Sequence, residues 1–174
     1  MCLSLAANLE EKTLAAFLVA MEEGYGNNPY HNPVHAADVL MSTHLFLSTY
    51  GFIDRLSHGE LLATLISAII HDYNHPGTSN AHEMKVLSHR AITYSDRSPL
   101  ESSHLACAFQ LLNTSGLDVL AGLGSEGFRS ARHLIIELVL HTDLAKHFEF
   151  ISVLQGIAAD AARNPNLARR PSTC

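Results

Sequence analysis

The chain has 174 residues, and its 47% hydrophobic content is enough for one domain with a sizeable core. Its formal net charge of −6 at pH 7 argues against binding to nucleic-acid polymers, because such binders usually carry a basic stripe. No apolar run approaches the roughly 20 residues of a membrane span, and the amino terminus lacks the basic start of a signal peptide. The three cysteines have no paired spacing, which favours a reducing compartment. We therefore expect a soluble, cytoplasmic protein.

Apolar residues recur at helical spacing along the chain, and no segment alternates as a strand would. The spacing over residues 14–21 predicts a first helix that ends near Gly24, followed by a turn at residues 27–29. Asn32 has the properties of a helix cap and Pro33 those of a first helical residue, so a second helix begins there and ends near Tyr50.

A third predicted helix spans about residues 59–70 and ends directly before His71 and Asp72. A fourth helix, capped by one of residues 78–80, extends to about Ala91. These helices and those that follow predict an all-α fold.

Residues 98–101 have the pattern of a capping box, with Pro99 at the first helical position, and predict a helix as far as about Asn113. A long helix from Ser125 to Lys146 or His147 and a segment over residues 148–162 follow. We therefore expect one domain over residues 1–162 and a polar tail over residues 163–174.

Two short stretches, residues 30–35 and 71–77, gather imidazoles and a carboxylate at helix boundaries. If the stretches meet in space, His35, His71 and Asp72 supply two nitrogens and a carboxylate to one ion and leave positions open for water. A carboxylate near the carboxyl end of a helix is disfavoured unless a cation compensates it, which favours a metal at Asp72. The alternative is that the histidines only cap helix ends, and the residues by themselves leave the two interpretations equal.

Other polar residues have simple structural explanations. Glu101 is the third residue of the predicted capping box. Asp143, beside Thr142, lies late in the predicted long helix, where a solvent-facing position is the default.

Taken together, these motifs resemble the catalytic domain of the class I cyclic nucleotide phosphodiesterases, within the HD metal-hydrolase superfamily. Several separate motifs occur in the family's order over nearly the whole chain. The matching segments are residues 17–18, 28–32, 35–39, 71–80, 94–101, 108–112 and 142–148.

The resemblance implies a role for each matching residue. His31 would be the general acid that protonates the departing O3′, and Glu101 would orient and charge it. His35, His71 and Asp72 would hold a zinc ion, and Asp72 would also reach a second ion, magnesium or manganese. His75 and Thr142 would lie near the metal-bound waters, and Tyr30 and Asn80 would support the pocket. Asp143 and Leu144 would line its nucleotide side.

The resemblance also implies the reaction: hydrolysis of 3′,5′-cyclic nucleotides, cAMP or cGMP, to nucleoside 5′-monophosphates by a hydroxide that bridges the two ions. Two other functions stay open, namely a non-catalytic phosphodiesterase-like module that binds a metal or a partner, and another HD-type hydrolase of non-cyclic phosphate esters. Ser103 replaces the first histidine of a common family pair and leaves His104.

The family's domain is about twice as long as this chain, so we expect only its amino-terminal portion. A further aspartate ligand, the glutamine that reads the purine and the aromatic residue that clamps the base would be missing. Apolar residues would then be exposed and could promote association: Leu134, Ile135, Leu138 and Val139.

Overall fold

The computed structural model describes residues 9–163. All regular elements in this part of the chain are helices, and it contains no strand, which confirms the all-α prediction. Contacts divide it into two units, with the division between Leu140 and His141. The boundary predicted after residue 162 stays a prediction, and the predicted tail lies outside the described residues except for Arg163. None of the described helices combines the length and hydropathy of a membrane span.

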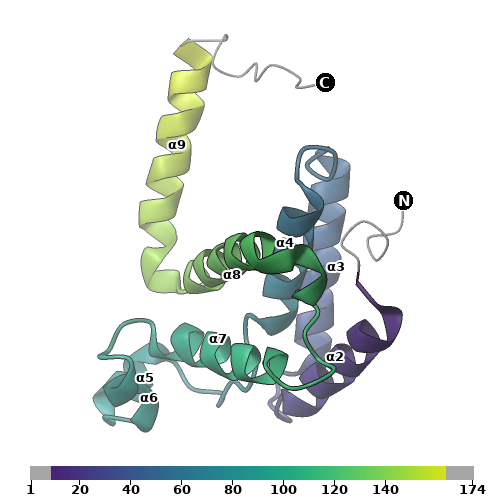
Figure 1. Cartoon of the computed structure of the whole chain (residues 1–174). Coiled ribbons are helices and arrows are strands. Elements are labelled where there is room, and N and C mark those ends of the chain that lie inside the picture. Colours follow the sequence, from purple (N-terminus) through teal and green to yellow (C-terminus); the bar gives the residue numbers. More distant parts are fainter. Residues whose placement is uncertain (1–8, 164–174) are drawn as a thin grey trace. The chain divides into compact units, whose positions relative to one another are not determined.

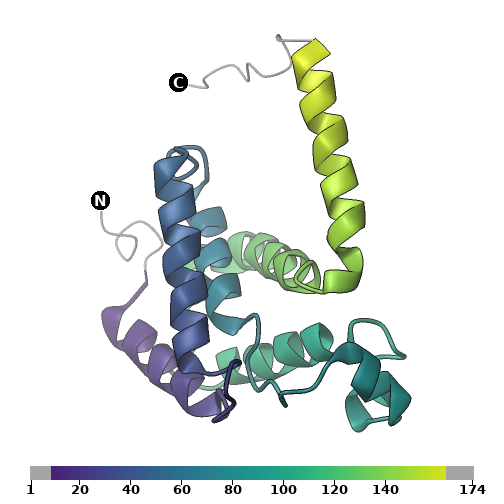
Figure 2. The same ribbon diagram turned by 180° about the vertical axis from the view of Figure 1, so that it is seen from behind.

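The helix α4 lies at the centre of the first unit and packs against α3, α7 and α8 (Figure 1). Figure 2 shows the same arrangement from behind, where α3 lies over α4. The elements in chain order are α2 (Glu11–Gly24), α3 (Pro33–Thr49), α4 (His58–Ile70), α5 (Asn80–Lys85), α6 (His89–Thr93), α7 (Pro99–Leu112), the 3₁₀ helix η1 (Ala121–Leu123) and α8 (Gly124–Leu140).

The central position of α4 follows from its composition, because its side chains are apolar on nearly every face. Between Leu62 and Ile70 most of its residues are buried, and they form the middle of the core. The helix begins at a capping box, in which the Ser57 hydroxyl accepts from the Glu60 N–H and the Glu60 carboxylate accepts from the Ser57 N–H. The sequence interpretation overlooked this box.

The expectation that an apolar face of α8 would be exposed is wrong for two of its four residues. Ile135 and Val139 are fully buried in the core that α8 shares with α4. Leu134 is partly buried against the same core, and Leu138 is 36% exposed. Because α4 is apolar on nearly every face, it covers Ile135 and Val139, and the first unit buries these two residues by itself.

The second unit contains η2 (Leu144–Lys146) and α9 (His147–Arg163). The predicted helix from Ser125 to Lys146 or His147 is therefore wrong beyond Leu140, and Asp143 is a cap: its carboxylate accepts from the Ala145 N–H at 2.9 Å. No residue of α9 is buried. Exposed apolar side chains, which could promote association, are present on it: Phe148, Phe150, Ile151, Val153, Leu154 and Ile157.

The predicted fourth helix is in fact two short ones. Leu87 has a φ of 49°, which interrupts the helical path after α5, and the Ser88 hydroxyl then caps α6 by accepting from the Ala91 N–H. Of the three candidate caps for α5, Ser79 is the one used.

Pro99 begins α7 as predicted, but the capping box at its start is wrong. Ser98 is left-handed, with a φ of 44°, and its side chain makes no cap hydrogen bond. The Asn80 side chain takes its place, because its carbonyl oxygen accepts from the Leu100 N–H at 2.9 Å. The side-chain cap of α7 therefore comes from Asn80 and not from Ser98.

Gly24 at the end of α2 is required by a close approach. A Cβ atom at this position would overlap the ring of Tyr73, the residue after Asp72. We expect Gly24→Ala to destabilise the fold by about 1–3 kcal/mol, because the ring must be displaced. Gly59→Ala is the matched control, since its nearest neighbour would be 3.9 Å away. Thermal unfolding of both variants tests this, and equal midpoints would contradict it.

Candidate metal centre

The first turn of α3 is held by Asn32, as predicted. Its side-chain oxygen accepts from the N–H groups of Val34 at 3.0 Å and His35 at 3.2 Å. This cap fixes the backbone that carries His35, and it leaves His31 directly before the helix.

The end of α4 provides the second part of the site. His71 Nδ1–H donates to the Ala68 carbonyl oxygen at 2.9 Å, so its Nε2 lone pair points away from the helix and can bind a cation. The Asp72 N–H donates to the hydroxyl of Tyr25 at 3.3 Å, and that hydroxyl donates to the Ile69 carbonyl oxygen at 2.7 Å. Burial raises the pKa of Tyr25 well above its ordinary value, so this hydroxyl keeps its proton.

Three side-chain atoms from α3 and the end of α4 form a nearly equilateral triangle. His35 Nε2 and His71 Nε2 are 3.1 Å apart, and each is 3.2 Å from Asp72 Oδ2. Zinc bonds of about 2.0–2.1 Å place neighbouring ligand atoms roughly 3.0–3.4 Å apart, depending on the coordination geometry. The donor set and the spacing therefore both suit a divalent metal ion.

Burial and mutual contact shift the pKa of each residue of the triangle. Burial alone would raise the pKa of Asp72, but the hydrogen bond and charge of His71 outweigh it and lower this pKa to about 2. Burial likewise works against protonation of His71, and contact with Asp72 outweighs it, so the pKa of His71 is raised. Burial is also the main cause that lowers the pKa of His35. Asp72 is thus ionised at neutral pH and attracts a cation.

Beside the triangle, three imidazole rings lie nearly parallel. The rings of His31 and His75 stack with centroids 3.7 Å apart, and His104 lies beyond His75 at 5.2 Å. His75 Nδ1 accepts from the Gly77 N–H, so neutral His75 carries its proton on Nε2. His104 Nδ1–H donates to the Tyr73 carbonyl oxygen, and its Nε2 is 3.9 Å from Asp72 Oδ1.

Asp72, His75 and His104 also lie close enough together to be a second possible metal group. The sequence interpretation gave His104 no role. Its signal was the spacing Glu101-x-x-His104, which places both residues on one face of α7.

The remaining predicted residues of the first unit surround this cluster. Tyr30 is exposed, and its ring packs on His35 with centroids 4.6 Å apart. Asn80 donates to the buried Glu101 carboxylate at 2.9 Å. His31 Nε2 lies 4.0 Å from Asp72 Oδ2. That Glu101 orients His31 stays a prediction.

Thr142, Asp143 and Leu144 belong to the second unit. The structure shows Asp143 as the cap of η2 and Leu144 as 81% exposed. The predicted places of Thr142 near metal-bound waters and of Asp143 and Leu144 beside a nucleotide stay predictions.

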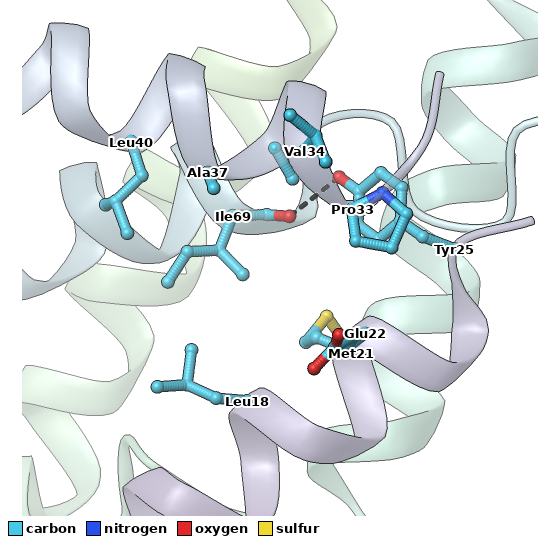
Figure 3. Close-up of a pocket in the computed structure, with 10 residues that line it drawn as sticks. Leu18, Met21, Glu22, Tyr25, Pro33, Val34, Ala37, Leu40 and Ile69 are labelled. Carbon is cyan, nitrogen blue, oxygen red and sulfur yellow. Dashed lines mark hydrogen bonds between the residues drawn. The ribbon is translucent and has the colours of Figure 1, made fainter. Parts of the chain in front are cut away.

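An apolar pocket of about 410 Å³ lies between α2 and the amino-terminal half of α3 (Figure 3). Side chains of α2, α3 and the end of α4 line it, and the Tyr25–Ile69 hydrogen bond crosses its wall. None of the three triangle residues lines this pocket. The possible metal site and the apolar pocket are therefore separate, and Tyr25 contacts both.

The buried histidines predict how the metal-free fold depends on pH. Burial lowers the pKa of His75 and of His104 from 6.5 to about 4, so the unfolded chain takes up these protons first. The stability that depends on His75 and His104 is complete above about pH 6.5 and is lost as the pH falls towards 4. The raised pKa of His71 acts in the opposite direction and offsets part of this loss. Below that range Asp72 continues the loss down to about pH 2.

Urea unfolding of chelator-treated protein between pH 7 and pH 4.5 measures this dependence. His104→Gln should flatten the curve, whereas His58→Gln, at the exposed start of α4, should leave its slope unchanged. A metal-free fold that is more stable at pH 4.5 than at pH 7 would contradict the prediction.

Comparison with known proteins identifies the family of this helical domain. The family model described as 3′5′-cyclic nucleotide phosphodiesterase matches residues 30–172. The chain therefore belongs to the 3′,5′-cyclic nucleotide phosphodiesterase family, as its motifs indicated.

Two relatives and one solved structure illustrate the similarity. The chain is 42% identical over 144 residues to the dual specificity calcium/calmodulin-dependent 3′,5′-cyclic nucleotide phosphodiesterase 1B of Homo sapiens, covering 82% of this chain and 27% of that protein. It is 41% identical over 146 residues to the probable 3′,5′-cyclic phosphodiesterase pde-1 of Caenorhabditis elegans, covering 83% and 22%. The phosphodiesterase domain of Salpingoeca rosetta rhodopsin phosphodiesterase matches with a TM-score of 0.85 and 35% identity, covering 88% of this chain and 46% of that one.

Proposed function

We propose that this site hydrolyses 3′,5′-cyclic nucleotides, cAMP or cGMP, to nucleoside 5′-monophosphates. The observation that carries the proposal is the triangle of His35, His71 and Asp72 with the His31 imidazole 4.0 Å from the shared carboxylate oxygen. Membership in the phosphodiesterase family supports the choice of substrate.

In this proposal His35, His71 and Asp72 would hold a zinc ion, and Asp72 would also reach a second ion, magnesium or manganese. When bound, such ions lower the pKa of water and offset the charge of the phosphoryl oxygens. The chain's own residues then hold and move protons. His31 gives a proton to O3′ as the phosphorus–O3′ bond breaks, while water supplies the new oxygen on phosphorus.

Neighbouring residues support these steps. His75 presents an Nε2–H donor beside the stacked ring of His31, because its Nδ1 accepts a hydrogen bond from the Gly77 N–H. Tyr25 holds the main chain of Asp72. Glu101, whose carboxylate accepts a hydrogen bond from Asn80, would orient His31. Tyr30 would support the pocket, and Thr142 would lie near the metal-bound waters. Asp143 and Leu144 would line the nucleotide side.

A second candidate is a non-catalytic module that binds metal or a partner. The apolar side chains exposed on α9 favour this candidate, because such a surface suits association.

Turnover and metal content separate the two candidates. Purified protein with Zn²⁺ and Mg²⁺ should release 5′-AMP from cAMP or 5′-GMP from cGMP, and a chelator should stop the release. Elemental analysis of the purified chain identifies the metals. Bound metal without release of either product would contradict catalysis and favour the module.

A further inference from the structure

One asparagine side chain joins the two histidine stretches, which are far apart in the sequence. Asn28 Nδ2 donates to the His75 carbonyl oxygen, 47 residues away, at 2.8 Å. The same nitrogen lies 3.4 Å from the His31 carbonyl oxygen, a longer second hydrogen bond. A single amide group thus contacts the main chains of both residues.

Asn28 is also linked to the helix that carries His35. Its own carbonyl oxygen accepts from Asn32 Nδ2 at 3.0 Å, and the Asn32 oxygen caps the N–H of His35. Asn28 and Asn32 together therefore connect the first turn of α3 with the turn at His75 by hydrogen bonds. A displacement of either side must break one of these hydrogen bonds.

The turn at His75 is shaped around this amide. Gly77 has a φ of 84°, and a Cβ atom there would lie 2.8 Å from Asn28 Oδ1. The Gly77 N–H in turn donates to His75 Nδ1 at 2.9 Å, which sets the proton on the opposite ring nitrogen. The contacts of Asn28 and the orientation of the His75 ring thus depend on the same backbone conformation.

These hydrogen bonds determine how the rings of His31 and His75 lie relative to each other. Because one nitrogen binds the carbonyls of both residues, the main chains that carry His31 and His75 are held at a fixed separation, and their rings stack at 3.7 Å and 17°. Neither hydrogen bond involves a side chain of the metal triangle. A change confined to the Asn28 side chain therefore acts first on the main chains of His31 and His75, and not on the three side chains of the triangle.

We propose that Asn28 is a positioning residue for the hydrolysis, which holds His31 and His75 stacked by bonding both of their carbonyl oxygens. The inference rests on the proposed function for its effect on turnover. Its structural part, the dependence of the two rings on Asn28, is independent of turnover.

The variant Asn28→Asp tests the proposal with almost no change of shape, because a carboxylate has no N–H and would face two carbonyl oxygens. We expect kcat for the cyclic nucleotide to fall about 10–100-fold, as for a displaced catalytic group. Zn²⁺ affinity, measured by competition with a chelator, should change by less than about threefold. Asn113→Asp, at an exposed position at the end of α7, adds the same charge and serves as the control.

Histidine-ring ¹H–¹⁵N spectra of the zinc-loaded chain provide the readout without turnover. Asn28→Asp should shift the ring signals of His31 and His75, and Asn113→Asp should not. If Asn28→Asp fails to fold by circular dichroism, Asn28→Ser is used; it keeps one shorter donor and should give the same pattern with smaller changes.

The proposal is overturned by ring signals that stay unchanged, by an unchanged kcat, or by Zn²⁺ affinity that falls in parallel with kcat. The last result would mean that Asn28 only stabilises the whole site. A wild-type chain without turnover would refute the proposed function, and the ring spectra would still decide whether Asn28 positions the two histidines.

Discussion

Replacing Asp72 with asparagine is expected to abolish tight binding of divalent metal. Asp72 Oδ2 lies 3.2 Å from both imidazole nitrogens of the triangle, so it contributes the only negative charge among those three groups. The amide has nearly the same shape but no charge and only one oxygen. We expect Zn²⁺ affinity to fall at least about 100-fold, at the upper end of the losses seen for residues that merely support metal ligands.

Competition with a chromogenic chelator measures this change at pH 7, where the low pKa of Asp72 keeps it ionised. Asp54→Asn removes the same charge at an exposed position and is the control. The fold should survive, because the Asp72 N–H still donates to Tyr25. A Zn²⁺ affinity equal to that of the control would show that the triangle does not bind the metal.

Replacing His31 with alanine should have the opposite profile: metal binding is kept and turnover is lost. The His31 ring lies outside the triangle, with its Nε2 4.0 Å from Asp72 Oδ2. Loss of a general acid typically lowers the rate about 10²–10⁴-fold, and we expect kcat for cAMP or cGMP to fall in this range. Zn²⁺ affinity should stay close to that of the wild-type chain.

The role of acid, as opposed to general support, is tested with two substrates. A nucleoside 5′-p-nitrophenyl phosphate has a leaving group that departs without a proton, so His31→Ala should slow its hydrolysis far less than that of the cyclic nucleotide. His44→Ala, on the exposed part of α3, should affect neither substrate. Equal losses on both substrates would contradict the acid role.

Local signals were sufficient to predict much of the fold around the site. Asn32 and Pro33 begin α3 because an N-cap and a proline need only their own turn to act. Gly24 ends α2, and α4 delivers His71 and Asp72 at its carboxyl end, as the apolar spacing indicated. Such features depend on neighbours within a few residues.

Two of the errors of prediction have long-range causes. Ser98 and Glu101 have the pattern of a capping box, but Asn80 from another helix supplies the cap. Ile135 and Val139 seemed to need an absent partner, yet α4 covers them. In each case the deciding partner is tens of residues away, and a periodic pattern contains no information about it.

The helical class and the family could be predicted from the sequence, because cap signals, apolar spacing and motif order depend on residues close together in the chain. The sequence also predicted His35, His71 and Asp72 as a possible metal group, but it gave no role to His104. Only the tertiary structure decided that His35, His71 and Asp72 lie 3.1–3.2 Å apart, that His104 lies beside them, and that Asn28 joins the two stretches. The physical reason is that these distances depend on how α3, α4 and α7 pack around a shared core. That packing is a sum of many apolar contacts, which no single motif specifies.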